Sequence, residues 1–216
     1  MRKTLLSIAA AGGLTALVAG GLNAQGGPPQ LPGAVDASRV TAGTYATDAS
    51  HSLVGWKVNH FGFNDYFGIF GDVAGTLEID PANLNAAKVD VTIPVASVVT
   101  ASAGLTEHLM RAGANGGNPD FFGPNPAPAR FVSTSVHTTG AHTAHIMGDL
   151  TLNGVTKPVT IQAEFSGAGN HPFNQRATLG FHGNTTIKRS EWGLGGFVPL
   201  VGDDVELDIT IAFEKQ

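Results

Sequence analysis

The strongest constraint on the fold is an alternation of apolar and polar residues with a period of two. In the segment 52–60, Val54, Trp56 and Val58 fall on one side, and glycine or polar residues fall on the other. This period is typical of a β-strand with one buried and one solvated face. The chain is therefore predicted to be all-β, with about eight antiparallel strands. The other alternating segments are 73–80, 89–95, 130–138, 144–152, 159–165, 177–182 and 205–213.

One helix is predicted, over residues 101–112. Leu105, His108 and Leu109 have the i, i+3, i+4 spacing that places them on one helical face. The next segment, 113–129, is rich in Gly, Asn and Pro and is predicted to be a loop. A helical bundle is excluded, because the 29 Gly and 12 Pro of the chain break helices.

Eight such strands can close into a barrel or stack as a sandwich, and the alternation does not separate the two. A closed barrel of this size is just wide enough to hold one small ligand. An outer-membrane barrel is disfavoured, because the polar strand faces carry charges such as Lys57, Glu164 and Asp208. In such a barrel those side chains would face lipid.

Charge and cysteine content exclude several classes of function. The chain has 12 Lys and Arg against 17 Asp and Glu, a net charge of −5, so we expect no nucleic-acid partner. The absence of Cys excludes disulfides, thiolate metal sites and cysteine catalysis. No motif pairs a nucleophile with a base and no pair of acids suits a glycosidase, so no catalytic residue is predicted and the protein is not expected to be an enzyme.

The N-terminal residues are typical of an export signal. Arg2 and Lys3 precede an apolar stretch rich in Ala and Gly, and Ala24 is the predicted cleavage site of a signal peptide, 1–24. A membrane anchor is the less favoured alternative, because the apolar stretch is short and diluted with Gly. We expect a flexible leader over 25–42, a folded domain over 43–216, and a periplasmic location.

Several blocks of sequence occur in a characteristic order between residues 43 and 216. The most specific is Gly148–Val159, with the sequence GDLTLNGVTKPV. The others are Tyr45–His60, Gly68–Gly75, Glu107–Leu109, Phe121–Phe122, Arg130–Ser133, Arg189–Gly193 and Val201–Val205. In this order they resemble the YceI-like family of secreted, lipocalin-like proteins, in which Gly68–Gly75 would correspond to the second strand.

The resemblance implies an extended eight-stranded antiparallel lipocalin-like barrel with one short helix, around an apolar tunnel. It also implies that the tunnel holds a long isoprenoid for transport or storage: a polyprenyl chain, a polyprenyl phosphate or an isoprenoid quinone. Each buried methylene of such a chain contributes about 0.8 kcal/mol. No cofactor other than this ligand is expected. A membrane donor or acceptor protein is expected as a partner, and the oligomeric state, a homodimer included, stays open.

The predicted ligand-binding residues share the inward face of a strand, the helix or the neighbouring aromatic segments. For the Phe residues, a tunnel lining and ordinary core packing stay equal alternatives. The set is Val54, Trp56, Val58, His60, Phe61, Phe67, Phe70, Leu77, Val91, Ile93, Leu105, His108, Leu109, Phe121, Phe122, Ile161, Phe181, Arg189 and Trp192.

Some polar residues have two interpretations. His60 and His108 lie on apolar faces, where a hydrogen-bonded core histidine is favoured over a contact with a ligand head group. Arg189 could bind a phosphate head group, but pairing with Glu191 or Asp203 to fix a corner is favoured. Two alternative functions stay open, an interaction module with a filled core and, less favoured, an enzyme acting on such a lipid.

Three histidines flank the hairpin predicted for 130–152. His137, His142 and His145 have the imidazoles that zinc or copper could use. However, His142 and His145 differ in strand parity and should point to opposite faces. No metal site is therefore predicted.

Overall fold

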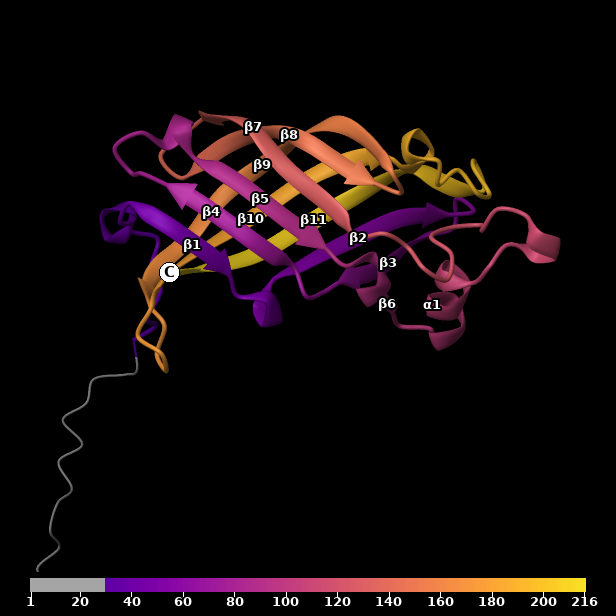
Figure 1. Cartoon of the computed structure of the whole chain (residues 1–216), viewed down its shortest axis with the longest axis horizontal. Coiled ribbons are helices and arrows are strands. Elements are labelled where there is room, and N and C mark those ends of the chain that lie inside the picture. The colour runs from indigo at the N-terminus through magenta and orange to yellow at the C-terminus, as the bar shows by residue number, and fades with distance from the viewer. Residues whose placement is uncertain (1–29) are drawn as a thin grey trace, which may run out of the picture. The chain divides into compact units, whose positions relative to one another are not determined.

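The computed structural model describes residues 30–216, in which antiparallel strands form one sheet that closes on itself (Figure 1). The expected signal peptide, 1–24, and residues 25–29 of the expected leader lie outside the described residues. The strands are β1 (Gly43–Thr47), β2 (Leu53–His60), β3 (Asn64–Phe70), β4 (Ala74–Ile79), β5 (Lys88–Ile93), β6 (Val99–Thr100), β7 (Ala129–Thr138), β8 (Thr143–Leu152), β9 (Val155–Asn170), β10 (Ala177–Lys188) and β11 (Val201–Lys215).

Eight of the strands form a closed ring, in the order β1-β4-β5-β7-β8-β9-β10-β11 with β11 returning to β1. β11 is long enough to pair with two strands, one after the other, along the same edge. Phe213 near its end pairs with Thr47 of β1, whereas its earlier part, from Val201 to Thr210, pairs with β2. β2 continues into β3 and β6, which extend the wall of the barrel. The predicted eight-stranded antiparallel barrel with one short helix is confirmed.

Several details of the strand prediction are wrong, and β3 and β6, like β1, lie outside the alternating segments. The strand that closes the ring is β1, which is short and was not predicted because GTYAT has no alternation of apolar and polar residues. The block Gly68–Gly75 is not one strand, because the backbone leaves the sheet between β3 and β4, where Asp72 has a φ of 55°. β9 and β10 also extend beyond the predicted segments 159–165 and 177–182.

The one α-helix among the described residues is α1 (Ala103–Met110), within the predicted range 101–112. It begins after Ser102, whose side chain accepts a hydrogen bond from the backbone N–H of Leu105. In Figure 1, α1 lies beside β3 and β6, at the end of the barrel away from the C-terminus. None of the helices in the described part of the chain is long and apolar enough to span a membrane.

The end of the barrel near the C-terminus is closely packed. Tyr45, Ala168, Leu179 and Phe213 are each 2% exposed or less. The segment before β1 adds to this packing, because Ala34 forms a β-bridge with Ala168. These contacts close one end of the barrel. The division of the chain into a leader, 25–42, and a domain, 43–216, stays a prediction.

Candidate functional site

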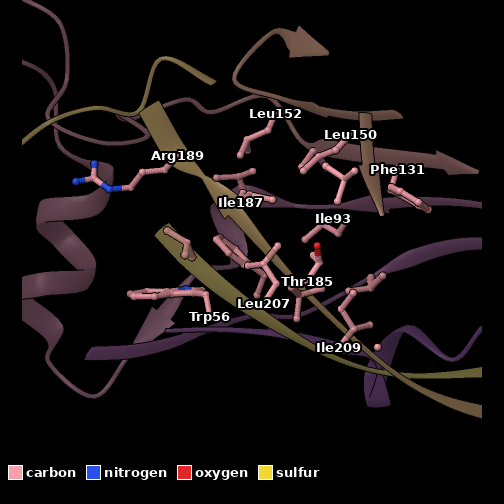
Figure 2. A pocket seen from close by; sticks show the side chains of 18 of the residues that line it. Trp56, Ile93, Phe131, Leu150, Leu152, Thr185, Ile187, Arg189, Leu207 and Ile209 are labelled. Carbon is pink, nitrogen blue, oxygen red and sulfur yellow. The ribbon is translucent and has the colours of Figure 1, made fainter. Parts of the chain in front are cut away.

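The barrel encloses a cavity of about 500 Å³. Its wall is almost entirely apolar and comes from inward-facing side chains of the strands, from α1 and from loops at the α1 end. Figure 2 shows Ile93 of β5, Ile187 of β10, and Leu207 and Ile209 of β11 around the same space. A volume of this order is typical of sites for small molecules, about 300–1,000 Å³.

The alternation of the sequence explains why the wall is apolar. Along β11, Val205, Leu207, Ile209 and Ile211 all line the cavity. Glu206, between the first two, points outward and pairs with Lys57 at 2.6 Å. Because successive side chains of a strand point to opposite faces, one alternating segment supplies both a cavity wall and a solvated surface.

All but two of the predicted ligand-binding residues lie on the cavity wall. This location places them together in space, while their binding of a ligand stays a prediction. The residues on the wall are Val54, Trp56, Val58, His60, Phe61, Phe70, Leu77, Val91, Ile93, Leu105, His108, Leu109, Phe121, Phe122, Ile161, Phe181 and Arg189.

Phe67 and Trp192 do not line the cavity, which corrects their assignment to its wall. Phe67 pairs in register with the outward-facing Lys57 and is 62% exposed. Trp192 is buried outside the cavity, in the corner after β10, where its indole Nε1–H donates to the carbonyl oxygen of Leu150 at 3.2 Å. Phe67 was placed by its aromatic neighbours and not by strand parity, and no periodic pattern supported Trp192.

Several wall residues were missed by sequence reasoning. Phe131 and Leu150 lie on β7 and β8, two strands whose weaker alternation could have revealed them. Phe197 lines the cavity from the loop 193–200, and a glycine-rich loop gives no periodic signal. Thr185 of β10 is also on the wall (Figure 2), where its hydroxyl lies among aliphatic side chains.

Arg189 lies at one end of the cavity but donates its hydrogen bonds to backbone carbonyl oxygens. Its Nε–H donates to Gly202 at 2.8 Å, and one Nη donates to both Gly196 and Val201 at 2.8 Å. The other Nη donates to the carbonyl oxygen of Leu194. Burial lowers the pKa of Arg189, yet a guanidinium stays charged near neutral pH. Arg189 therefore ties together the loop between β10 and β11.

The expected ion pair of Arg189 with Glu191 or Asp203 is not formed. Asp203 instead accepts hydrogen bonds from the backbone N–H and the hydroxyl of Ser190, both at 2.8 Å. Burial alone would raise the pKa of Asp203, but these two hydrogen bonds and the positive charges of Lys188 and Arg189 together lower it. Arg189 does fix a corner, as the favoured interpretation held, but it does so through the backbone.

A second polar group lies where α1 meets the cavity. His108 Nε2 and an Nη of Arg111 each lie 2.9 Å from the same carboxylate oxygen of Asp120. The hydrogen bond from His108 and then that from Arg111 lower the pKa of Asp120. The ring of His108 is also 5.4 Å from that of Phe121, centroid to centroid. His108 is thus hydrogen-bonded, the interpretation that the sequence favoured.

Trp56 is packed against the backbone of β3 on the cavity wall. A Cβ at Gly68 would lie 2.2 Å from the ring carbon Cζ2 of Trp56, so only glycine fits there. Among the described residues, the Trp56 indole Nε1 is the buried side-chain nitrogen or oxygen without a hydrogen-bond partner.

The cavity opens at the α1 end. Phe61 and Phe197 both line the cavity, and both are 47% exposed, so they lie where it meets the surface. Their position contrasts with the packed end around Leu179, which is 1% exposed. A long apolar molecule could enter the barrel lengthwise through this opening.

The three histidines of the β7–β8 hairpin lie apart from the cavity. His137 and His145 are cross-strand partners, and the ring of His142 is 6.1 Å from that of Phe165. In the part of the chain that the structure describes, no group of three or more His, Asp or Glu side chains is arranged to hold a metal ion.

Solved structures share this architecture. BcnA of Burkholderia cenocepacia superposes with a TM-score of 0.63 at 24% identity, over 77% of this chain and 98% of BcnA. The YCEI protein of Campylobacter jejuni gives a TM-score of 0.60 at 26% identity, over 73% and 90%. A domain from Saccharophagus degradans, described as polyisoprenoid binding, gives 0.55 at 13% identity, over 80% and 98%. The matches to BcnA and to the Saccharophagus degradans domain show a shared fold alone, because the sequence identity is low.

Sequence relatives cover most of the chain. A UPF0312 protein of Ectopseudomonas mendocina is 39% identical over 189 residues, which are 86% of this chain and 95% of the relative. A UPF0312 protein of Pseudomonas putida is 36% identical over 186 residues, 84% and 92% of the two chains. The family model of the YceI-like domain matches residues 45–213. The chain therefore belongs to the YceI-like domain family.

Proposed function

We propose that this protein holds one long isoprenoid chain in its barrel cavity and serves as a periplasmic carrier or store. The candidate ligands are a polyprenyl chain, a polyprenyl phosphate and an isoprenoid quinone. The observation that carries the proposal is the cavity of about 500 Å³, apolar along its wall and open at one end. The Saccharophagus degradans domain, with the same fold, is described as polyisoprenoid binding, which supports this ligand class.

The driving force in this proposal is the burial of hydrocarbon. At about 0.8 kcal/mol per methylene, two five-carbon isoprene units contribute on the order of 8 kcal/mol before the entropic costs of binding. Thr185 offers the ligand a hydroxyl among aliphatic neighbours such as Ile187 and Leu207. Specificity then follows mainly from the length and width of the cavity.

Arg189 supports recognition of the chain over recognition of a phosphate. Its guanidinium nitrogens donate to four backbone carbonyl oxygens, and its side chain is 6% exposed. Releasing it toward a head group would leave these buried acceptors unsatisfied. A neutral polyprenol or quinone should therefore bind about as well as the corresponding phosphate.

The periplasmic location rests on the signal-peptide pattern of residues 1–24. Fractionation of cells that express the full chain, with N-terminal sequencing of the periplasmic protein, tests it. Cleavage near Ala24 is expected, and an uncleaved protein in the membrane fraction would overturn the location. A membrane donor or acceptor protein and a homodimer stay predictions.

Fluorescence quenching tests whether a ligand enters the cavity. Trp56 lines the cavity and Trp192 does not, so Trp192→Phe leaves one tryptophan as a cavity probe. We expect a short-chain ubiquinone to quench this emission saturably, and the polyprenol solanesol to compete with it. Linear, non-competed quenching would contradict binding in the cavity.

Two adjacent threonines give a matched pair of variants. Thr185 lines the cavity, whereas Thr186 is exposed on the outer face of β10. Thr185→Trp should fill the cavity and weaken ubiquinone binding by about tenfold or more, a free-energy loss of about 1.4 kcal/mol. Thr186→Trp adds the same side chain outside and should bind as the parent does. Because both variants add a tryptophan, ubiquinone bound to protein is measured by equilibrium dialysis.

The filled-core alternative makes the opposite prediction. The cavity weighs against it, since a filled core would leave no space of this size among residues such as Leu150 and Ile161. If dialysis detects no ubiquinone or solanesol bound to the parent protein, the interaction module becomes the better explanation.

A further inference from the structure

Three segments meet around the opening of the cavity. The turn between β2 and β3 contacts the loop 193–200, because the backbone N–H of Phe61 donates to the carbonyl oxygen of Leu200 at 2.7 Å. The third segment is the region after α1, where the ring of Phe121 lies 6.1 Å from that of Phe197. The opening is therefore bordered by chain segments that are far apart in the sequence.

Large apolar side chains from two of these segments are exposed to solvent. Phe63 is 87% exposed, Leu200 59%, and Val198 39%. With Phe61 and Phe197, each 47% exposed, they form what we call the mouth rim. Neither 61–63 nor 193–200 contains a charged residue. Such a concentration of exposed apolar side chains on a folded protein marks an interaction surface.

Two charged side chains near the mouth rim, Asp120 and Lys57, are in ion pairs, whereas Asp65 after the turn accepts a hydrogen bond from Asn59. Asp120, whose backbone approaches Gly196 of the rim loop, binds His108 and Arg111. Lys57, on the strand that leads into Phe61, pairs with Glu206 at 2.6 Å. Paired charges of this kind give little net attraction to an anionic surface, so contact through the rim would depend on apolar burial.

We propose that the mouth rim inserts into the surface of a lipid bilayer. This inference rests on the proposed function and gives it a route for loading and release. The rim surrounds the cavity opening, so a hydrocarbon chain that leaves the barrel emerges between Phe61 and Phe197. When those residues lie in lipid, the chain passes from one apolar medium to another without exposure to water. Aromatic side chains at loop tips are suited to this interfacial position.

Vesicle flotation tests the proposal with the exported protein, expressed with its own N-terminal segment. We expect it to float with phosphatidylcholine vesicles that contain no isoprenoid. Because the attraction is apolar, raising the salt concentration should not release it. Phe63→Ser should lower the vesicle partition coefficient by about tenfold, because Phe63 contributes the most exposed ring of the rim. Phe63 does not line the cavity, so the change should leave the cavity wall intact. Leu200→Ser should act in the same direction.

Phe173→Ser is the matched control. Phe173 is 90% exposed, like Phe63, but its turn lies at the packed end, where Asn174 Nδ2 donates to Glu214 of β11. This variant should float as the parent protein does. All three variants should still bind short-chain ubiquinone in solution, because none of the changed residues is on the cavity wall.

Each contrary result has its own meaning. If the parent protein binds ubiquinone in solution but does not float, the membrane inference fails and the proposed function stands. If it floats but binds neither ubiquinone nor solanesol, the proposed function fails. Flotation that salt abolishes, or that Phe63→Ser and Phe173→Ser reduce equally, overturns insertion through the rim. If sedimentation shows a dimer that Phe63→Ser dissociates while vesicle binding persists, the rim is an interface between copies.

Discussion

The guanidinium of Arg189 is the clearest case in which one side chain determines local structure. It reaches the carbonyl oxygens of Leu194, Gly196, Val201 and Gly202, which lie along the loop between β10 and β11. That loop carries Phe197 to the cavity opening. A side chain with several donors in a fixed fork suits this position, because it can satisfy carbonyls on separate segments at once.

Arg189→Lys should therefore destabilise the fold. A lysine ammonium cannot reach the same four carbonyl oxygens, and the buried acceptors that it leaves unsatisfied cost about 2–4 kcal/mol in total. Urea unfolding, followed by circular dichroism, measures the loss. If stability is unchanged while binding of polyprenyl phosphate falls selectively, Arg189 is a head-group ligand instead.

The lowered pKa of Asp120, near the cavity opening, predicts that the stability of the fold depends on pH. Hydrogen bonds from His108 and Arg111 lower its folded-state pKa, so its ionised form stabilises the fold. This contribution is complete above the ordinary carboxyl pKa of about 3.9 and is lost as pH falls through the folded-state value. Asp120→Asn should thus be less stable than the parent at about pH 7, and the difference should vanish in acid.

Urea unfolding across this pH range, with Asp149→Asn as control, checks the prediction. Asp149 is exposed and has no ion pair among the described residues. A stability difference for Asp120→Asn that persists in acid would mean that the carboxylate charge is not its cause.

At the residue scale, sequence predicts side chains that obey strand parity and fails for those whose role depends on tertiary contacts. Trp56 and Val58 were placed on the wall because their strand alternates. The backbone partners of Arg189 lie in a loop whose path no local pattern describes. Phe197 was missed for the same reason, and Phe67 was misplaced because it was grouped with neighbouring Phe residues while its strand, β3, was not predicted.

Among the strands, the contact between β2 and β3 depends on one glycine. Trp56 lies over Gly68, and a methyl group at that position would come within 2.2 Å of its ring. Gly68→Ala should therefore push Trp56 out of place and cost about 1–3 kcal/mol through overpacking. Thermal unfolding measures the cost, and the emission of Trp56 in a Trp192→Phe background reports the displacement.

Gly55→Ala is the control for this change. Gly55 is also a strand glycine, on β2, but a Cβ there would lie 3.4 Å from the nearest atom, the carbonyl oxygen of Asp208. It should be tolerated far better than Gly68→Ala. Equal losses for the two variants would mean that the contact with Trp56 is not the cause of the loss at Gly68.

The predicted strands were most accurate where both faces of a strand had distinct environments. β11 has a cavity on one side and water on the other, so its alternation is long and regular. β1 has only five residues, with Tyr45 buried in the packed end, and its position follows from pairing with Leu77 and Lys215. Such long-range pairing leaves no local signal in GTYAT.

For the whole molecule, the alternation left barrel and sandwich open, and ring closure decides between them. The ring closes where the end of β11 pairs with β1, and the length of β11 lets its earlier part pair with β2. The same length leaves room for the cavity, since the packed cluster around Phe213 occupies only one end. The family resemblance predicted the barrel, but it did not predict the exposed rim at the cavity opening.

Native mass spectrometry of the protein, expressed with its own N-terminal segment and followed by solvent extraction, tests the central claim most directly. The account predicts one bound molecule per chain, with an extract containing a polyprenyl chain, a polyprenyl phosphate or an isoprenoid quinone. Thr185→Trp should carry less of it, and Thr186→Trp the same amount as the parent. A protein that is purified empty and binds neither added solanesol nor short-chain ubiquinone would contradict the account.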